Sequence, residues 1–148
     1  MDEYVNVGED IQYIVIKMGG EQFGIDIQYV DNIVRIQSIT RVPKVADYIK
    51  GVINLRGEII PVMNLRIKMN LEEEEYTKAS RIIILKFDQH ESIGFIVDEV
   101  KEVVTLNEFD VEKVEADRDE KLNFVSGVGK VTDGLVSVLD LHAVIEDY

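Results

Sequence analysis

The amino-acid sequence predicts a mostly β protein made of two packed copies of one small module. The chain repeats itself: Gly24 to Val34 matches Gly94 to Val104, 70 positions later, in its glycines and apolar residues but not in its polar ones. Apolar and polar residues also alternate with a period of two in many segments, and β-branched residues are abundant, which favours strands. Two copies are too few for a solenoid, so the repeat indicates two modules packed together.

The repeat continues along the chain at an offset of 76 residues. The further matches are Tyr48 to Val52 with Phe124 to Val128, and Ile59 to Leu65 with Leu135 to Leu141. A half-chain of this size would bury only about 60% of its unfolded surface and would be marginal alone. We therefore expect one domain over residues 1–148, in which two subdomains, residues 11–70 and 80–148, share a core.

Each copy is expected to contain about five strands, rolled into a small barrel. The first hairpin turns at Gly19-Gly20, where glycine supplies positive φ, and its counterpart turns at Asp88 to Glu91. Later hairpins turn at Arg56 to Glu58 and at Thr132 to Gly134, where Asp-Gly is typical of a type I′ turn. Pro61 should lie at an edge or a bulge, because proline cannot donate to a β ladder.

Helical patterns are sparse. Asp26 can act as an N-cap for a helix in which Ile27, Val30 and Ile33 or Val34 recur at three- and four-residue spacing. The same spacing recurs in the second copy, where a bulged strand explains Val97 to Val104 equally well. Asn64 and Asp140 occupy equivalent positions and are predicted to cap two short helices. These helices would cover Leu65 to Met69 and Leu141 to Glu146.

Charge and composition argue against several functional classes. The net charge of -13 repels phosphate backbones and anionic lipid, which argues against binding to nucleic acid or to a membrane surface. The chain has no cysteine, which excludes disulfides and thiolate nucleophiles and fits a reducing cytoplasm. The acidic runs Glu72 to Glu75 and Asp110 to Lys121 are predicted to be solvated linkers.

The sequence contains no motif for catalysis. His90 and His142 stand outside any metal-ligand spacing and are predicted to be surface residues. Gly127 to Lys130 is not a phosphate loop, because Val131 occupies the position where Ser or Thr would hold magnesium. We therefore expect no catalytic residues, metal or cofactor. A carboxylate site between the two copies, in an enzyme or a ligand sensor, remains the rival hypothesis.

One segment has an unusual density of specific residues. Asn54-Leu55-Arg56-Gly57 lies between Gly51-Val52-Ile53 and Ile60-Pro61-Val62, and this stretch resembles the signature of the chemotaxis coupling protein (CheW) family. Phe23 to Ile27 and Val30 to Val34 also resemble the first-copy pattern of that family. The likeness extends from about Ile11 to Ile145, in the same order and at the same spacing.

The resemblance implies a fold and a function. The fold would be two SH3-like five-stranded β-barrels with a few short helices. The function would be that of a non-enzymatic cytoplasmic scaffold, which joins methyl-accepting chemotaxis proteins to the regulatory domain of the histidine kinase CheA. The scaffold would reach membrane-tethered receptor clusters through its partners, without inserting into the membrane. The alternative is a CheW-like regulatory or ligand-sensing module of another two-component pathway.

The same resemblance implies a receptor-binding surface near the seam between the barrels, and leaves the kinase-binding residues unassigned. Asn32 stands where members often carry an acid, so a charge pair at this position is not expected. The residues that the resemblance implies for receptor binding are Val30, Asn32, Ile33, Gly51 and Arg56.

The repeat helps to interpret these residues. Thr132 stands at the position equivalent to Arg56, so the fold does not require arginine there, which favours a binding role for Arg56. Gly51 recurs as Gly127, which instead favours a backbone requirement common to both copies. Ile27 and Val34 can fill an inward stripe, which leaves room for either Val30 or Ile33 to project outward.

Overall fold

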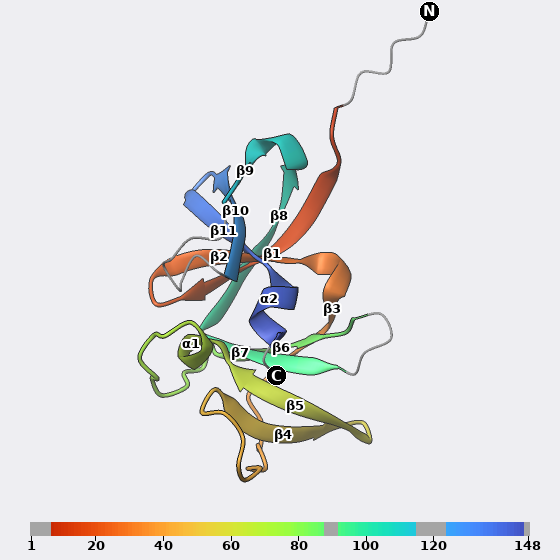
Figure 1. Cartoon of the computed structure of the whole chain (residues 1–148), viewed down its shortest axis with the longest axis vertical. Coiled ribbons are helices and arrows are strands. Elements are labelled where there is room, and N and C mark those ends of the chain that lie inside the picture. Colours follow the sequence, from red (N-terminus) through yellow and green to blue (C-terminus); the bar gives the residue numbers. More distant parts are fainter. Residues whose placement is uncertain (1–6, 88–91, 115–123, 147–148) are drawn as a thin grey trace, which may run out of the picture.

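The computed structural model describes residues 7–87, 92–114 and 124–146, which form two β-sheets arranged along the long axis of the molecule (Figure 1). The strands of the first copy are β1 (Asp10–Met18), β2 (Glu21–Asp26), β3 (Val30–Arg35), β4 (Ile49–Leu55) and β5 (Glu58–Asn64). Those of the second copy are β6 (Arg81–Leu85), β7 (Ile93–Val97), β8 (Glu99–Asn107), β9 (Val111–Lys113), β10 (Val125–Val131) and β11 (Gly134–Leu139). The short helical elements are η1 (Ile27–Tyr29), α1 (Leu65–Lys68), η2 (Glu108–Asp110) and α2 (Leu141–Ile145).

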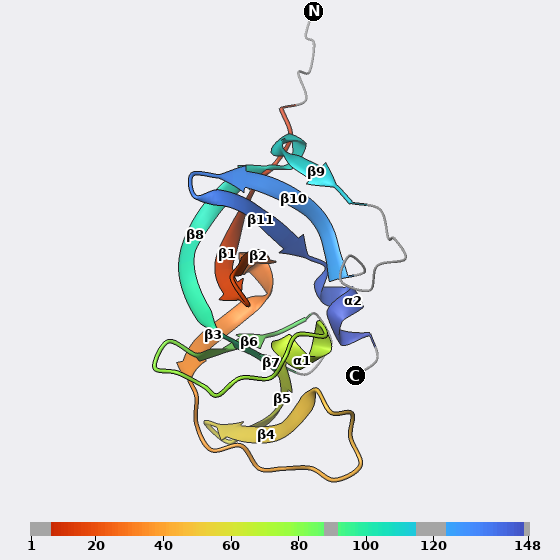
Figure 2. The same ribbon diagram turned by 90° about the vertical axis from the view of Figure 1, so that its left-hand side faces the viewer.

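Each sheet combines strands from both copies. The six-stranded sheet has the order β8-β1-β2-β11-β10-β9, and the five-stranded sheet has the order β3-β6-β7-β5-β4. The two sheets occupy opposite halves of the molecule, with α2 between them (Figures 1 and 2). The β1–β2 hairpin of the first copy thus lies in one sheet with β8 to β11 of the second copy. The β6–β7 hairpin of the second copy lies in the other sheet with β3 to β5 of the first copy. The expectation that each copy rolls into its own barrel is therefore wrong: the division at residues 11–70 and 80–148 separates the two copies of the repeat, but both sheets extend across it.

The exchange of hairpins is reciprocal. β5 pairs in parallel with β7, and Val62 lies opposite Gly94. β11 pairs in parallel with β2, and Val138 lies opposite Gly24. These two pairings join equivalent positions of the two copies, so the halves are related by an approximate twofold symmetry.

The two copies share a core, as the sequence predicts. The main cluster joins Ile16 and Met18 of the six-stranded sheet to Ile83 and Leu85 of the five-stranded sheet. Leu65, which begins α1, packs into the same cluster. Full burial of one such aliphatic side chain stabilises the fold by about 1.5–3 kcal/mol. Smaller apolar clusters fill the interior of each half.

The hairpin turns follow the sequence with one exception. Gly19 and Gly20 have φ of 59° and 85°, and Arg56 and Gly57 have φ of 53° and 86°, which are values of type I′ turns. The prediction of a type I′ turn at Asp133-Gly134 is wrong. The turn there consists of Thr132 and Asp133, neither of which has a positive φ, and Gly134 already pairs with Val131 in the ladder. The predicted turn at residues 88–91 lies outside the described residues.

The helix predicted after Asp26 is a single 3-10 turn. The Asp26 side chain accepts a hydrogen bond from the Gln28 amide at 3.0 Å, but the chain then continues as β3. The β-branched residues Val30, Ile33 and Val34 favour an extended chain, and β6 pairs with it. In the second copy the bulged-strand interpretation is confirmed from Glu99 onward, because the β1–β8 register shifts between Val15 and Ile16, whereas Val97 belongs to β7 in the other sheet.

The two capped helices are confirmed. Asn64 Oδ1 accepts a hydrogen bond from the Ile67 amide at 3.3 Å, and Asp140 Oδ1 accepts one from the Ala143 amide at 3.2 Å. Pro61 lies in the part of β5 that pairs only with β4, which is locally an edge as predicted. Within the described parts of the chain, no helix is long and apolar enough to span a bilayer.

The acidic runs are more ordered than predicted. The side chains of Glu72 to Glu75 are exposed, but Glu73 forms an ion pair with Lys50 at 2.6 Å and Glu74 lies 3.3 Å from Arg66. These contacts anchor the run on the five-stranded half. In the second run the linker prediction is wrong at residues 111–113, which form β9 against β10, and residues 115–121 lie outside the described residues.

Candidate functional site

Three of the five predicted site residues lie on β3, an edge strand of the five-stranded sheet. Half-buried and exposed positions alternate along it. Val30 is half-buried and packs against the main core, whereas Ile33 is 36% exposed. Ile27 and Val34 are half-buried against the apolar clusters. Ile33 is therefore the aliphatic side chain that projects outward, but it does so through the two-residue alternation of a strand and not through the helical stripe that the sequence predicts.

Asn32 lies directly after a bulge in β3. The β3–β6 register shifts between Val30 and Asn32, which leaves Asp31 as the extra residue with an exposed side chain. Asn32 Oδ1 accepts a hydrogen bond from the Ile33 amide at 2.9 Å. This local bond holds the amide group against its own strand, so Asn32 shapes the backbone that carries Ile33.

Gly51 is required by the backbone. Its φ is 143°, and a Cβ atom would lie 2.0 Å from the carbonyl oxygen of Thr40. Thr40 and Val52 exchange two backbone hydrogen bonds of 2.8 Å, which closes the segment after β3 onto β4. At Gly127 a Cβ would lie 2.6 Å from Val111 Cγ1. The backbone requirement common to both copies is therefore confirmed as the close approach of a neighbouring segment, although only Gly51 combines it with positive φ.

Arg56 occupies a conformation that does not favour arginine. It is exposed at the tip of the β4–β5 hairpin with φ of 53°, a region that costs most L-residues about 1–2 kcal/mol. The Asn54 side chain stabilises the turn by accepting a hydrogen bond from the Gly57 amide at 3.0 Å. Within the described residues, no acidic group lies within ion-pair distance of Arg56. The turn itself gives no reason for arginine, which favours a role in binding.

Strand pairing in the five-stranded sheet relates the positions of Asn32 and Gly51. Asn32 lies opposite Ile84, Ile84 opposite Gly94, Gly94 opposite Val62, and Val62 opposite Gly51. Asn32 and Gly51 thus share one row but lie on the two edge strands of the sheet, and the bridge between Thr40 and Val52 joins the segment after β3 to β4.

The site residues belong to two separate elements. Val30 follows η1, where the chain passes from one sheet to the other, so the β3 group lies at the seam. Gly51 and Arg56 belong to the β4–β5 hairpin, which lies at the far side of the five-stranded half (Figure 1). The structure brings Val30, Asn32 and Ile33 together and places the other two on a separate hairpin.

An apolar hollow of about 370 Å³ adjoins Gly51 and was not identified from the sequence. Val42 and Val45, which are 38% and 44% exposed, lie on the loop that covers it. Tyr48 and Pro61 form other parts of its wall. The sequence signal that could have indicated this hollow is the pair of valines on either side of Pro43.

Two exposed aliphatic residues repeat between the copies. Ile59 on β5 is 57% exposed, and Leu135 at the equivalent position of β11 is 62% exposed. Ile60 and Val136, the next residues on the same strands, are buried. An apolar residue at an outward position of both copies was visible in the repeated segments. Single exposed aliphatic residues are common on protein surfaces, so neither residue marks a site by itself.

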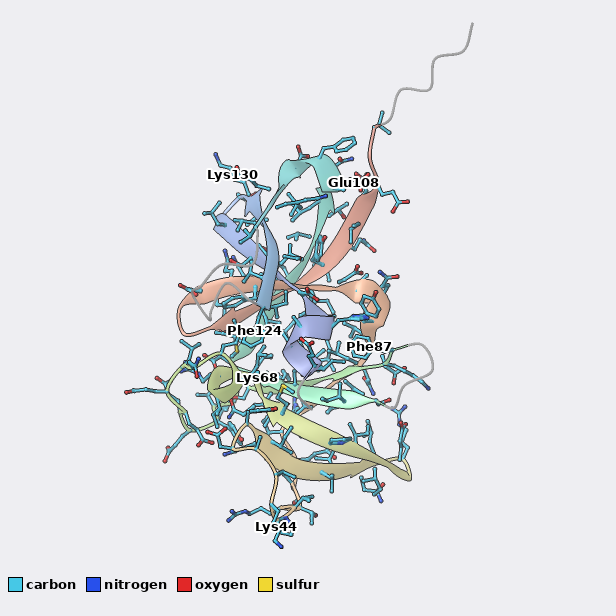
Figure 3. The ribbon with its side chains drawn as sticks, viewed as in Figure 1. Lys44, Lys68, Phe87, Glu108, Phe124 and Lys130 are labelled. Carbon is cyan, nitrogen blue, oxygen red and sulfur yellow. The ribbon has the colours of Figure 1, made fainter. Side chains whose placement is uncertain are left out.

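The seam contains a cation held by two aromatic rings. Lys68 Nζ lies 4.2 Å from the ring centre of Tyr48 and 5.6 Å from that of Phe124 (Figure 3). Tyr48 and Phe124 occupy equivalent positions of the repeat. Because cation–π contacts favour a fixed placement of the ammonium group, Lys68 helps to join the two copies.

Few polar side chains are buried in the described part of the chain. The buried polar side chains there are Asn64, Ser80 and Ser92, and no group of three or more His, Asp or Glu side chains is placed to hold a metal. His142 is exposed, as predicted, and His90 lies outside the described residues.

Comparison with known proteins identifies the family. Residues 12–148 match the family model of the CheW-like domain. The chain belongs to this family. The chemotaxis protein CheW of Bacillus subtilis (strain 168) is 37% identical over 150 residues, which cover 99% of this chain and 92% of that protein. The chemotaxis protein CheW of Helicobacter pylori is 30% identical over 93% of this chain and 83% of its own length.

The fold agrees with that of a solved CheW protein. The crystal structure of the scaffolding protein TtCheW from Thermoanaerobacter tengcongensis superposes with a TM-score of 0.85 and 33% identity, over 93% of this chain and 94% of that one. The predicted fold class, two SH3-like β-barrel subdomains with few helices, is confirmed for this CheW-like chain.

Proposed function

We propose that this CheW-like chain is a non-enzymatic scaffold that couples methyl-accepting chemotaxis proteins to the histidine kinase CheA in bacterial chemotaxis signalling. The likeness to a protein described as a scaffold, over 93% of the chain in both sequence and structure, carries this proposal. The curated relatives, named chemotaxis proteins, support the same pathway. The scaffold would work in the cytoplasm, where its partners tether it to membrane-bound receptor clusters.

The receptor contact is proposed to use Val30, Asn32, Ile33, Gly51 and Arg56 in different ways. Ile33 offers an exposed aliphatic side chain of the kind that packs against an amphipathic helix. Arg56 offers a guanidinium group without an intramolecular acidic partner in the described chain, which can bind a carboxylate or carbonyl in a bidentate manner that lysine cannot reproduce. The backbone around Ile33 and Arg56 is proposed to be shaped by Val30, Asn32 and Gly51.

Co-sedimentation tests the scaffold role. The purified chain should sediment with receptor arrays in the presence of CheA, and should bind the receptor cytoplasmic fragment and CheA in separate pull-downs. A chain that is folded by circular dichroism but binds neither protein would contradict the proposal. Saturable binding of a small metabolite or metal in calorimetry would instead support the ligand-sensing alternative.

A further inference from the structure

The chain passes between the two sheets twice. It leaves the six-stranded sheet through η1, between β2 and β3, and returns through Asp98, between β7 and β8. The two crossings are equivalent in the repeat, because Gln28 of η1 corresponds to Asp98. Contacts at these two crossings therefore bear on the angle between the sheets.

The crossing at Asp98 is held by ionic hydrogen bonds. Arg66 of α1 donates from Nε to Asp98 Oδ1 and from Nη2 to Asp98 Oδ2, each at 2.7 Å. The Gly19 amide, in the β1–β2 turn, donates to Asp98 Oδ2 at 3.1 Å. Arg66 Nη1 also donates to the Glu72 carbonyl oxygen at 2.9 Å. One carboxylate thus joins α1, on the five-stranded half, to a turn of the six-stranded sheet.

The equivalent crossing at η1 is held by aromatic rings. His142 of α2 stands at the position equivalent to Arg66. Its ring lies edge-on to Tyr29 and to Phe87, with centroids 6.1 Å and 5.4 Å apart, and the Tyr29 and Phe87 centroids are 5.3 Å apart. Gln28 makes its side-chain hydrogen bond within the same turn, to Asp26 at 2.9 Å. Among the residues that the structure describes, this crossing has no counterpart of the ion pair.

The two kinds of contact differ in stiffness. A bidentate bond between guanidinium and carboxylate fixes both distance and orientation. The Arg66 side chain is only 12% exposed, so salt screens this pair less than a surface pair. Ring packing tolerates sliding and rotation over a wider range of geometries. In addition to the shared core, the Arg66–Asp98 pair therefore restricts rotation of one sheet against the other more tightly than the aromatic rings do.

We propose that Arg66 and Asp98 are positioning residues that set the angle between the two sheets and thereby orient β3 for receptor docking. The docking part rests on the proposed scaffold function. β3 begins directly after the aromatic crossing, since Tyr29 precedes Val30. If the ionic crossing loosens, the sheets rotate about the aromatic one, and the exposed face of β3 changes its direction relative to the six-stranded sheet.

Distance measurement between two spin labels tests the geometric part. The chain contains no cysteine, so Ile59→Cys and Leu135→Cys place one label on each sheet, at equivalent and more than half-exposed strand positions. Arg66→Met should at least double the width of the distance distribution measured by pulsed electron paramagnetic resonance. Arg66→Lys, which keeps the charge but cannot form the bidentate bond, should give a distribution of intermediate width.

A matched control removes an ion pair that lies within one sheet. Lys101 of β8 lies 2.8 Å from Asp133 and also bonds Gln22 of β2, all in the six-stranded sheet. Lys101→Met should leave the distribution unchanged. An unchanged distribution in folded Arg66→Met would overturn the proposal. If Arg66→Met does not fold, Asp98→Asn, which still accepts from Gly19, replaces it and should broaden the distribution.

Receptor binding tests the docking part on the cysteine-free chain. Arg66→Met should weaken binding of the receptor fragment at least fivefold, with partial recovery in Arg66→Lys and no change in Lys101→Met. A broadened distance distribution with unchanged receptor affinity would overturn the docking role. If the unaltered chain itself binds no receptor, the scaffold function and the docking role both fail, while the distances still decide whether the pair sets the sheet angle.

Discussion

At the residue scale, backbone conformation separates binding residues from structural ones. Gly51 and Arg56 belong to the same sequence signature and both have positive φ. Gly51 lies against the Thr40 carbonyl and has no room for a side chain, whereas Arg56 is exposed at a turn that asparagine or glycine would suit better. The sequence already distinguished them through Gly127 and Thr132, but the strain at Arg56 is visible only in the structure.

Arg56→Asn should weaken receptor binding without loss of stability. Asparagine tolerates the left-handed region, so the free energy of unfolding should stay within about 0.5 kcal/mol of the original or rise. Denaturant titration and a receptor pull-down measure the two effects. The control is Thr132→Asn at the equivalent turn, which should leave binding intact. A parallel fall of stability and binding in Arg56→Asn would show that Arg56 is structural.

Gly51→Ala should lose stability and binding together. The new Cβ would overlap the Thr40 carbonyl, and the backbone cannot keep its φ of 143° without strain, at a cost of at least about 1–3 kcal/mol. Gly57→Ala is the matched control, because its φ is 86° but no atom lies within 4 Å of the new Cβ. Thermal melting should show a clearly larger drop for Gly51→Ala. Equal drops would contradict the role assigned to the Thr40 contact.

At the element scale, hairpins and capped helices could be predicted because their signals are local. Gly19-Gly20, Asn64 and Asp140 each act on residues within a few positions. The segment after Asp26 could not be assigned from such signals, since the cap is real but pairing with β6 overrides the helical spacing. The outward direction of Ile33 depends on the same pairing and on the bulge at Asp31.

The joint between α1 and the β7–β8 crossing should respond to acid. Burial by itself raises the pKa of Asp98, but the hydrogen bonds from Arg66 and Gly19 and the Arg66 charge outweigh it and hold this pKa below its ordinary value. Because the folded-state pKa is lowered, the stabilisation is present above the unfolded pKa of about 3.9 and is lost as the pH falls through the folded pKa.

Asp98→Asn provides the measurement of this acid response. The difference in free energy of unfolding between the original chain and Asp98→Asn should be constant above about pH 5 and should shrink below about pH 4. Denaturant titrations at a series of pH values give this difference. A difference that grows on acidification would show that Asp98 is not stabilised as a carboxylate.

At the scale of the whole molecule, the duplication and shared core could be predicted, but the exchange of hairpins could not. The parallel pairs β5–β7 and β11–β2 join residues far apart in sequence, and parallel pairing leaves no turn between its strands. Equivalent glycines and apolar positions show that two copies exist. They do not show which copy supplies each strand, because both copies present the same alternation.

The exchange predicts how the chain behaves when it is divided. Separate fragments 1–79 and 80–148 each lack strands from both sheets, so each should be largely unfolded by circular dichroism. An equimolar mixture should recover the β spectrum of the whole chain and run as a one-to-one complex in size-exclusion chromatography. A fragment that folds cooperatively alone would contradict this expectation.

The reciprocal hairpins also explain what the covalent link between the halves contributes. As separate polypeptides, the copies would have to find each other from solution, whereas a tether keeps each at an effective concentration on the order of millimolar for the other. Neither half then needs to match itself, as a symmetric dimer must. One copy can carry Arg56 where the other carries Thr132. Likewise, an ion pair can hold the crossing at Asp98 while aromatic rings hold the equivalent crossing at η1.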